Sequence, residues 1–165
     1  MSSTLNQRAN SGPMAKVSIG PSGLGCSRAG EQAVDFAFAE AALRGAGLVA
    51  LHAWTTWNAP LPPPREPSMP YANPPGELAA EEERLLSEAL AGHRERYPDV
   101  TVKHEVVHGR TREALIEASR SAQLVVVGAR GRDGFAGLLL GSVSQALLHH
   151  AHCPVVVARG VGANQ

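Results

Sequence analysis

The sequence predicts an α/β protein, a single doubly wound domain in which five parallel strands form one sheet with helices on both faces. Three observations lead to this prediction. Short apolar segments alternate along the chain with longer segments of helical periodicity. Their spacing suits right-handed crossovers between parallel strands. A glycine-rich segment follows the most apolar of the strands, and such folds bind ligands beyond the carboxyl ends of their strands.

The composition argues against two classes of partner. Lys and Arg together number 15, as do Asp and Glu, so the formal net charge is zero at pH 7. Without a net field or a long apolar segment, we expect no nucleic-acid partner and no membrane partner. Residues 1–15 lack the apolar core of a secretory signal. We therefore expect a loose tail at 1–15, the domain at 16–159, a C-terminal tail at 160–165 and a cytoplasmic location.

The first half of the domain is expected to begin with a strand, a helix and a second strand. The first strand should enter at Lys16, although glycine and proline interrupt the residues that follow. Alanines and larger apolar residues recur from Glu31 to Arg44, which predicts a helix that Gly45 ends. Leu48 to Trp54 is an apolar strand. His52 within it is a catalytic candidate, but a buried histidine bonded to backbone is the simpler interpretation, because no acidic residue is near in sequence.

A proline-rich segment at 55–76 separates this strand from the next helix. Proline removes hydrogen-bond donors and favours extended geometry, so we expect a surface loop, either a variable insertion or a docking segment or lid. Glu77 to Arg96 then has the periodicity of an amphipathic helix with a charged face toward water. The expected inward residues are Leu78, Leu85, Leu86, Ala89 and Leu90, and the expected outward residues are Glu81, Glu82, Glu83 and Arg84.

The second half is expected to complete the sheet. Val100 to Val106 alternates apolar and polar residues, as a half-buried strand near a sheet edge does. Thr111 is expected to cap a helix that continues to Arg120. Leu124 to Val127 is the most apolar, central strand, and Val143 to His150 has helical periodicity.

The glycine-rich segment after the central strand is the expected site of chemistry. Gly128-x-x-Gly131, nine residues, then Gly141-Ser142 leaves much of the backbone bare, so its N–H groups can approach a ligand and adopt positive φ. Gly141 and Ser142 open a helix, whose free N–H groups attract phosphate. A Walker A loop would need Lys-Ser or Lys-Thr, and a dinucleotide fingerprint would need G-x-G-x-x-G, so neither motif fits.

This compound pattern resembles the ATP-binding signature of the universal stress protein family. The resemblance extends to the apolar run at 124–128, to Leu139-Leu140 before the G-S pair, and to a last strand beginning at Cys153-Pro154. It implies the strand order 3-2-1-4-5 and ATP as ligand, with Mg²⁺ as an option. The nucleotide-binding residues that it implies are Gly128, Arg130, Gly131, Gly141, Ser142, Val143, Ala53, Val127 and Gly25.

One position departs from the family pattern. The family's first strand ends in a motif whose aspartate helps to hold the adenosine, and here that aspartate aligns with Gly25 without a gap or with Ser22 with one. Neither alignment supplies a carboxylate.

The resemblance implies a nucleotide-responsive regulator in the stress response and a homodimer formed through the edge strand at 154–158. No residue is an evident general base, so we expect no catalytic residue and at most weak ATP hydrolysis. Two alternatives remain, a slow Mg²⁺-dependent ATPase that uses Ser142 and a nucleotide-free dimeric scaffold. A protein partner cannot be named from the sequence.

A cluster near the C-terminus has metal-ligand chemistry. His149, His150, His152 and Cys153 lie at the end of the last expected helix. No second pair of ligands is visible to complete a zinc site, and histidines also complement the dipole at a helix C-terminus. We therefore expect a structural role and no metal site.

Overall fold

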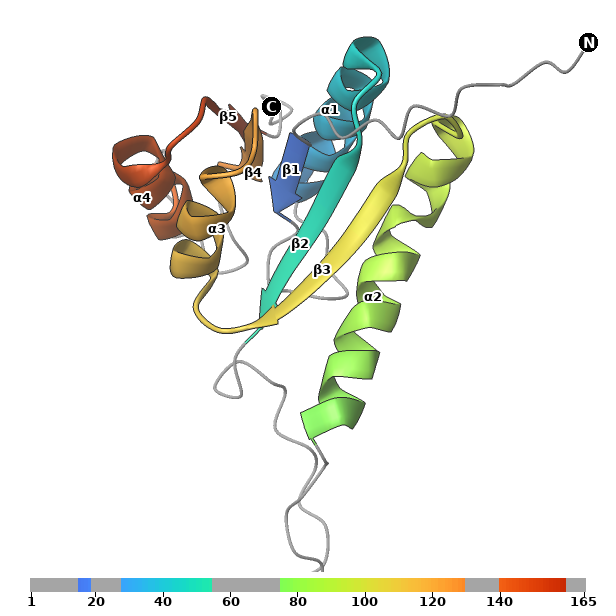
Figure 1. Ribbon diagram of the computed structural model, residues 1–165, viewed down its shortest axis with the longest axis horizontal. Coiled ribbons are helices and arrows are strands. Elements are labelled where there is room, and N and C mark those ends of the chain that lie inside the picture. Colours follow the sequence, from blue (N-terminus) through green and yellow to red (C-terminus); the bar gives the residue numbers. More distant parts are fainter. Residues whose placement is uncertain (1–14, 19–27, 55–74, 130–139, 160–165) are drawn as a thin grey trace, which may run out of the picture.

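The computed structural model describes residues 15–18, 28–54, 75–129 and 140–159 of the chain. Strands and helices alternate through these ranges (Figure 1). The elements are β1 (Ala15–Ser18), α1 (Arg28–Arg44), β2 (Leu48–Trp54), α2 (Pro75–Arg96), β3 (Val102–His108), α3 (Thr111–Ser119), β4 (Val125–Gly128), α4 (Ser142–His150) and β5 (Val155–Ala158). The predicted α/β class is confirmed.

The strands form one parallel sheet in the order β3-β2-β1-β4-β5, the order that the resemblance implied. Strand β1 is therefore central, although it is only four residues long. Ala15 pairs with Leu48, so strand β1 includes the residue before Lys16, where the first strand was expected to enter. Strand β3 lies at one edge, as its alternating pattern predicted, and β5 lies at the other.

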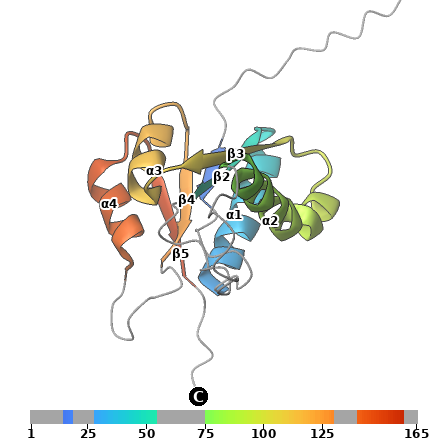
Figure 2. The ribbon, with the colours of Figure 1, turned by 90° about the horizontal axis from the view of Figure 1, so that it is seen from below.

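The helices cover the sheet in two layers (Figures 1 and 2). Helix α1 packs on β1, β4 and β5 and α2 packs on β2 and β3, whereas α3 and α4 cover the opposite face. Each layer has its own apolar core, because alternate residues of a strand point to opposite faces. Phe38, Leu86 and Val126 belong to the α1–α2 core, and Leu115 and Leu147 to the α3–α4 core.

Helix α1 ends as its sequence predicted. Gly45 has φ +58°, a conformation that glycine adopts without a Cβ penalty. Its N–H donates to the carbonyl of Ala42, and the N–H of Ala46 donates to the carbonyl of Ala41. These two bonds satisfy carbonyls that the end of the helix would leave without partners.

Helix α3 begins differently from its prediction. Thr111 is the first helical residue, so it stands one position too late to be the cap. The N-cap is Arg110, in extended conformation and without a side-chain capping bond. The predicted threonine cap is wrong because a cap residue has an extended backbone, which Arg110 has, whereas Thr111 is already helical.

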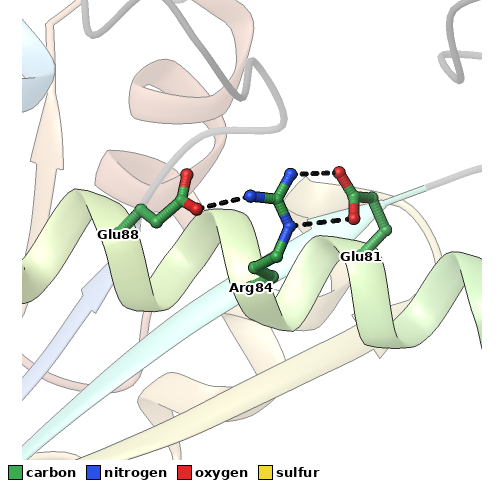
Figure 3. A network of polar contacts seen from close by, with 3 residues as sticks. All are labelled: Glu81, Arg84 and Glu88. Atoms are coloured by element: carbon green, nitrogen blue, oxygen red, sulfur yellow. Dashed lines mark hydrogen bonds and ion pairs between the residues drawn. The ribbon is translucent and has the colours of Figure 1, made fainter.

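Helix α2 presents two faces. Leu86 and Leu90 are buried in the core, as predicted. On the outer face, Arg84 donates to both carboxylate oxygens of Glu81 and to Glu88 (Figure 3). The hydrogen bond from Arg84 lowers the pKa of Glu81 below its ordinary value. Glu81 and Arg84 face water, as predicted, and Glu88 joins them there, but Glu82 does not belong to this face.

Several predictions fall outside the described residues. They are the tails at 1–14 and 160–165, most of the proline-rich segment at 55–74, and Gly25, Arg130 and Gly131.

Candidate functional site

The end of β4 and the start of α4 meet at the carboxyl edge of the sheet. Ala129, the residue after β4, is 3% exposed, and its N–H donates to the carbonyl of Ala158 over 2.7 Å. The N–H of Gly141 donates to the carbonyl of Ala129 over 2.7 Å. The two motif glycines at 128 and 141 are therefore brought together, although twelve residues separate them in the sequence.

The first turn of α4 is suited to an anion. Gly141 is its N-cap and supplies no capping side chain. The N–H groups of Ser142 and Val143 come too early in the helix to donate to one of its carbonyls. Ser142 is exposed, which leaves its hydroxyl accessible. No acidic residue lies in this first turn, whereas the first turns of α1 and α3 contain Glu31 and Glu113. This first turn would offer a bound phosphate N–H donors and has no carboxylate of its own to oppose it.

The expected positive φ is not found at the motif glycines that the structure describes. Gly141 has φ −79° and ψ 165°, which is ordinary extended backbone. Among the described glycines, Gly45 has the positive φ. Glycine is therefore not required at 141 by the backbone conformation.

Ser144 is a site residue that the sequence reasoning missed. Its side chain is 1% exposed, and its hydroxyl lies 3.1 Å from the carbonyl oxygen of Ala129 and 3.0 Å from that of Gly141. A signal was present, because Ser144 precedes the buried Leu147 by three residues and thus shares the inner face of α4. A polar residue on a buried helix face requires a hydrogen-bond partner.

Two further predicted residues lie on neighbouring strands. Ala53 near the end of β2 and Val127 in β4 are 1% and 3% exposed, and both belong to the α3–α4 core. Strand β1 lies between them in the sheet. At the adjacent strand ends, the rings of Trp54 and His108 are in contact, with their centroids 4.6 Å apart. Ala53 and Val127 thus lie on the two strands that flank β1.

His52 is buried, as predicted, but it has a partner that the sequence did not indicate. Its Nε2 lies 2.6 Å from Oε2 of Glu82 on α2. His52 is 3% exposed and the Glu82 side chain 19%, so the prediction that Glu82 faces water is wrong. His52 faces the α1–α2 side, opposite to Ala53, because successive residues of a strand alternate between faces. The pair joins α2 to the sheet and lies away from the first turn of α4.

The histidines at the end of α4 do not assemble with other ligands in the part of the chain that the structure describes. His149 and His150 have ring centroids 6.3 Å apart. Within that part, no three side chains of His, Cys, Asp or Glu are grouped as a metal ion would require. Nor does any described helix combine the length and apolar character needed to cross a membrane.

Comparison with known proteins identifies the family. A model of the universal stress protein family matches residues 23–159. A universal stress protein of Mycobacterium tuberculosis is 46% identical over 137 residues, which cover 83% of this chain and 44% of that protein. The chain thus spans less than half the length of this curated relative.

Solved structures share the fold. A universal stress protein of Archaeoglobus fulgidus in complex with dAMP has a TM-score of 0.59 and 20% identity, over 88% of this chain and 97% of that one. A universal stress protein in complex with cAMP has a TM-score of 0.53 and 23% identity, over 90% of this chain and 99% of that one. From the family match and the identity to the mycobacterial protein, the chain belongs to the universal stress protein family.

Proposed function

We propose that this chain binds ATP at the carboxyl edge of its sheet and acts as a nucleotide-responsive regulator in the stress response. The observation that carries the proposal is the junction of β4 and α4. There the motif residues Gly128, Gly141 and Ser142 converge on a helix N-terminus whose first turn has N–H groups without helical acceptors and contains no acidic residue.

Relatives with the same fold support this assignment. The two solved structures described above contain cAMP and dAMP, both of which carry adenine, a pentose sugar and phosphate. In our proposal the N–H groups of Ser142 and Val143 and the Ser142 hydroxyl hold phosphate oxygens. Ala53 and Val127 border the nucleoside, and Arg130, Gly131 and Gly25 complete the site from residues outside the described ranges. Mg²⁺ would accompany the phosphates.

A nucleotide-free scaffold is the second candidate, and one sequence observation favours it. The family's adenosine-binding aspartate is replaced by Gly25 or Ser22, so one charged hydrogen bond to the nucleoside is lost. The family model also begins its match at residue 23, after β1. The other alternative, a slow ATPase that uses Mg²⁺ and Ser142, would have the same binding site as the ATP-binding regulator and would also hydrolyse the bound ATP.

We also propose that two copies associate through β5. This strand lies at a sheet edge, and all four of its residues are half-exposed. An open edge offers backbone groups to a second strand, and twofold pairing would cover both edges at once. Leu148 on the neighbouring helix α4 is 53% exposed and would add apolar area beside the strand.

Calorimetric titration with ATP and Mg²⁺ tests the nucleotide proposal, and Ser142→Asp is the informative variant. The helix dipole stabilises a carboxylate in the first turn, so the variant should fold as well as the wild type. The same carboxylate would repel the phosphates, so affinity should fall by more than about tenfold, equivalent to roughly 1.4 kcal/mol.

Thr111→Asp is the matched control, because Thr111 is the first residue of α3 and the substitution adds the same charge to a different helix start. It should leave affinity unchanged. A wild-type protein that binds no ATP at millimolar concentration would exclude the proposal and favour the scaffold. Equal loss of affinity in both variants would exclude the α4 assignment.

A further inference from the structure

Ser144 links the two described parts of the candidate site. The Ala129 carbonyl receives the N–H of Gly141 over 2.7 Å and lies 3.1 Å from the Ser144 hydroxyl. Both of its acceptor positions are thus directed to the start of α4. The N–H of Ala129 is itself bonded to Ala158, so this residue is held on the β5 side as well.

The hydroxyl of Ser144 has one proton and two carbonyl oxygens within reach. Gly141, at 3.0 Å, belongs to its own helix, and Ala129, at 3.1 Å, belongs to the end of β4. The proton is therefore shared between the helix start and the strand end. Because the side chain is 1% exposed, water does not compete effectively for either bond.

We propose that Ser144 is a positioning residue for nucleotide binding, which fixes the first turn of α4 against the end of β4. This inference rests on the proposed function. Ser144 does not contact the nucleotide in this proposal. It holds the backbone from which the N–H groups of Ser142 and Val143 are offered, so that these donors need not be ordered when the phosphates bind.

The chain contains a matched control in Ser119. That side chain is also 1% exposed, and its hydroxyl also donates to the carbonyl three residues earlier, that of Ile116. It makes one long-range bond as well, from the N–H of His152. Ser119 lies at the C-terminal end of α3, however, and so at the opposite edge of the sheet from the start of α4.

The experiment compares Ser144→Ala with Ser119→Ala. Both variants lose a buried hydroxyl with two backbone partners, so both should lower the unfolding midpoint in urea. Nucleotide affinity, measured by titration with ATP and Mg²⁺, should fall about threefold to tenfold in Ser144→Ala and stay within experimental error in Ser119→Ala. Ser144→Cys, which keeps the size and a weaker donor, should lie between wild type and Ser144→Ala.

Amide exchange without nucleotide gives a second, independent measurement. The N–H of Gly141 should exchange faster in Ser144→Ala than in wild type and at an unchanged rate in Ser119→Ala.

The possible failures are distinguishable. If wild type binds ATP and both alanine variants bind it equally well, the positioning role is overturned and the proposed function stands. If the two variants lose affinity equally, Ser144 acts only through overall stability and the inference is also overturned. A wild-type protein that binds no ATP removes both proposals.

Discussion

Gly45 and Gly92 are two glycines in open surroundings with different backbone conformations. A Cβ atom built at either position would meet no heavy atom within 4 Å. Gly45 has φ +58° after the end of α1, whereas Gly92 lies within helix α2. Any effect of adding a methyl group therefore reflects the backbone conformation, because neither site has neighbours to clash with.

The same substitution should consequently have opposite effects at these two positions. Gly45→Ala should destabilise the fold by about 1 kcal/mol, because a side chain in the left-handed region costs about 1–2 kcal/mol. Gly92→Ala should stabilise it by about 0.5–1 kcal/mol, because alanine is the better helix former. Urea unfolding at one protein concentration measures both, and effects of the same sign would contradict the assigned conformations.

Restoring the missing acid is the residue-scale test of the nucleoside end of the site. Gly25 lies outside the described residues, and the prediction comes from the family pattern alone. Gly25→Asp should tighten ATP binding about tenfold to a hundredfold, because a hydrogen bond to a charged group contributes about 1.5–3 kcal/mol. The measurement is calorimetric titration of the variant and the wild type.

Inorganic triphosphate is the control ligand for that experiment, since it lacks the adenosine and should bind both proteins alike. If Ser22→Asp tightens ATP binding and Gly25→Asp does not, the gapped alignment is correct. No gain in either variant would mean that this part of the chain does not border the nucleoside.

At the scale of elements, helix α2 is held to its neighbours by histidine–carboxylate pairs as well as by leucines. Glu82 reaches His52 in β2, Glu83 lies 3.4 Å from His104 in β3, and His93 lies 3.1 Å from Asp35 in α1. The first of these pairs is the most buried, and its net contribution should be the largest, because solvent screens the exposed carboxylates of the others.

Glu82→Ala should therefore destabilise the protein by about 1–3 kcal/mol, since it removes the acceptor 2.6 Å from a buried imidazole. Glu81→Ala removes a carboxylate one residue earlier on the water-facing side and should change the stability little. Thermal unfolding of the two variants side by side shows whether the His52–Glu82 pair stabilises the fold more than a surface ion pair does. Equal melting temperatures would contradict this stabilising role.

Element types and much of their extent could be predicted from the sequence, and the reasons are local. Leu48–Trp54 has the predicted bounds because every residue in it is buried, and all of them except His52 are apolar. Gly45 was recognisable as a helix end because a positive φ favours glycine. Thr111 failed as a cap because the residue before it could take the extended conformation as well, and sequence pattern does not separate neighbouring cap positions.

Two of the missed contacts join residues that lie apart in sequence. The His52–Glu82 pair spans 30 positions and the Ser144–Ala129 bond spans 15. Periodicity indicates which face of an element is buried, but not which polar groups meet there once the elements pack. The motif glycines were found because their spacing is a property of the sequence, whereas their anchoring by Ser144 is a property of the packed edge.

At the scale of the whole molecule, the free edge of β5 determines how two copies would meet. The carbonyls of Pro154 and Ala158 accept the N–H groups of Val125 in β4 and of Ala129 directly after it. Backbone groups alternate in direction along a strand, so Val155 and Val157 turn theirs to the open side. A second strand would bond to these two residues.

Val157→Pro should therefore convert a dimer to a monomer. Proline removes an N–H that faces outward, and edge strands tolerate it because the bonds to β4 remain. Light scattering gives the mass, and circular dichroism establishes that the variant is folded. A wild-type protein that is monomeric at micromolar concentration, or a folded Val157→Pro dimer, would exclude association through this edge.

Strand β1 is the first of the five strands to be synthesised, yet one of its two neighbours in the sheet, β4, begins only at Val125. While the ribosome translates the intervening residues, β1, β2 and β3 can already pair, but the far side of β1 has no partner. An unpaired strand edge can bond to a strand of another chain, and a nascent domain is exposed to such association as it emerges from the ribosome. The growing polypeptide thus exposes an unpaired strand edge in what becomes the middle of the sheet, until β4 has been translated and pairs with β1.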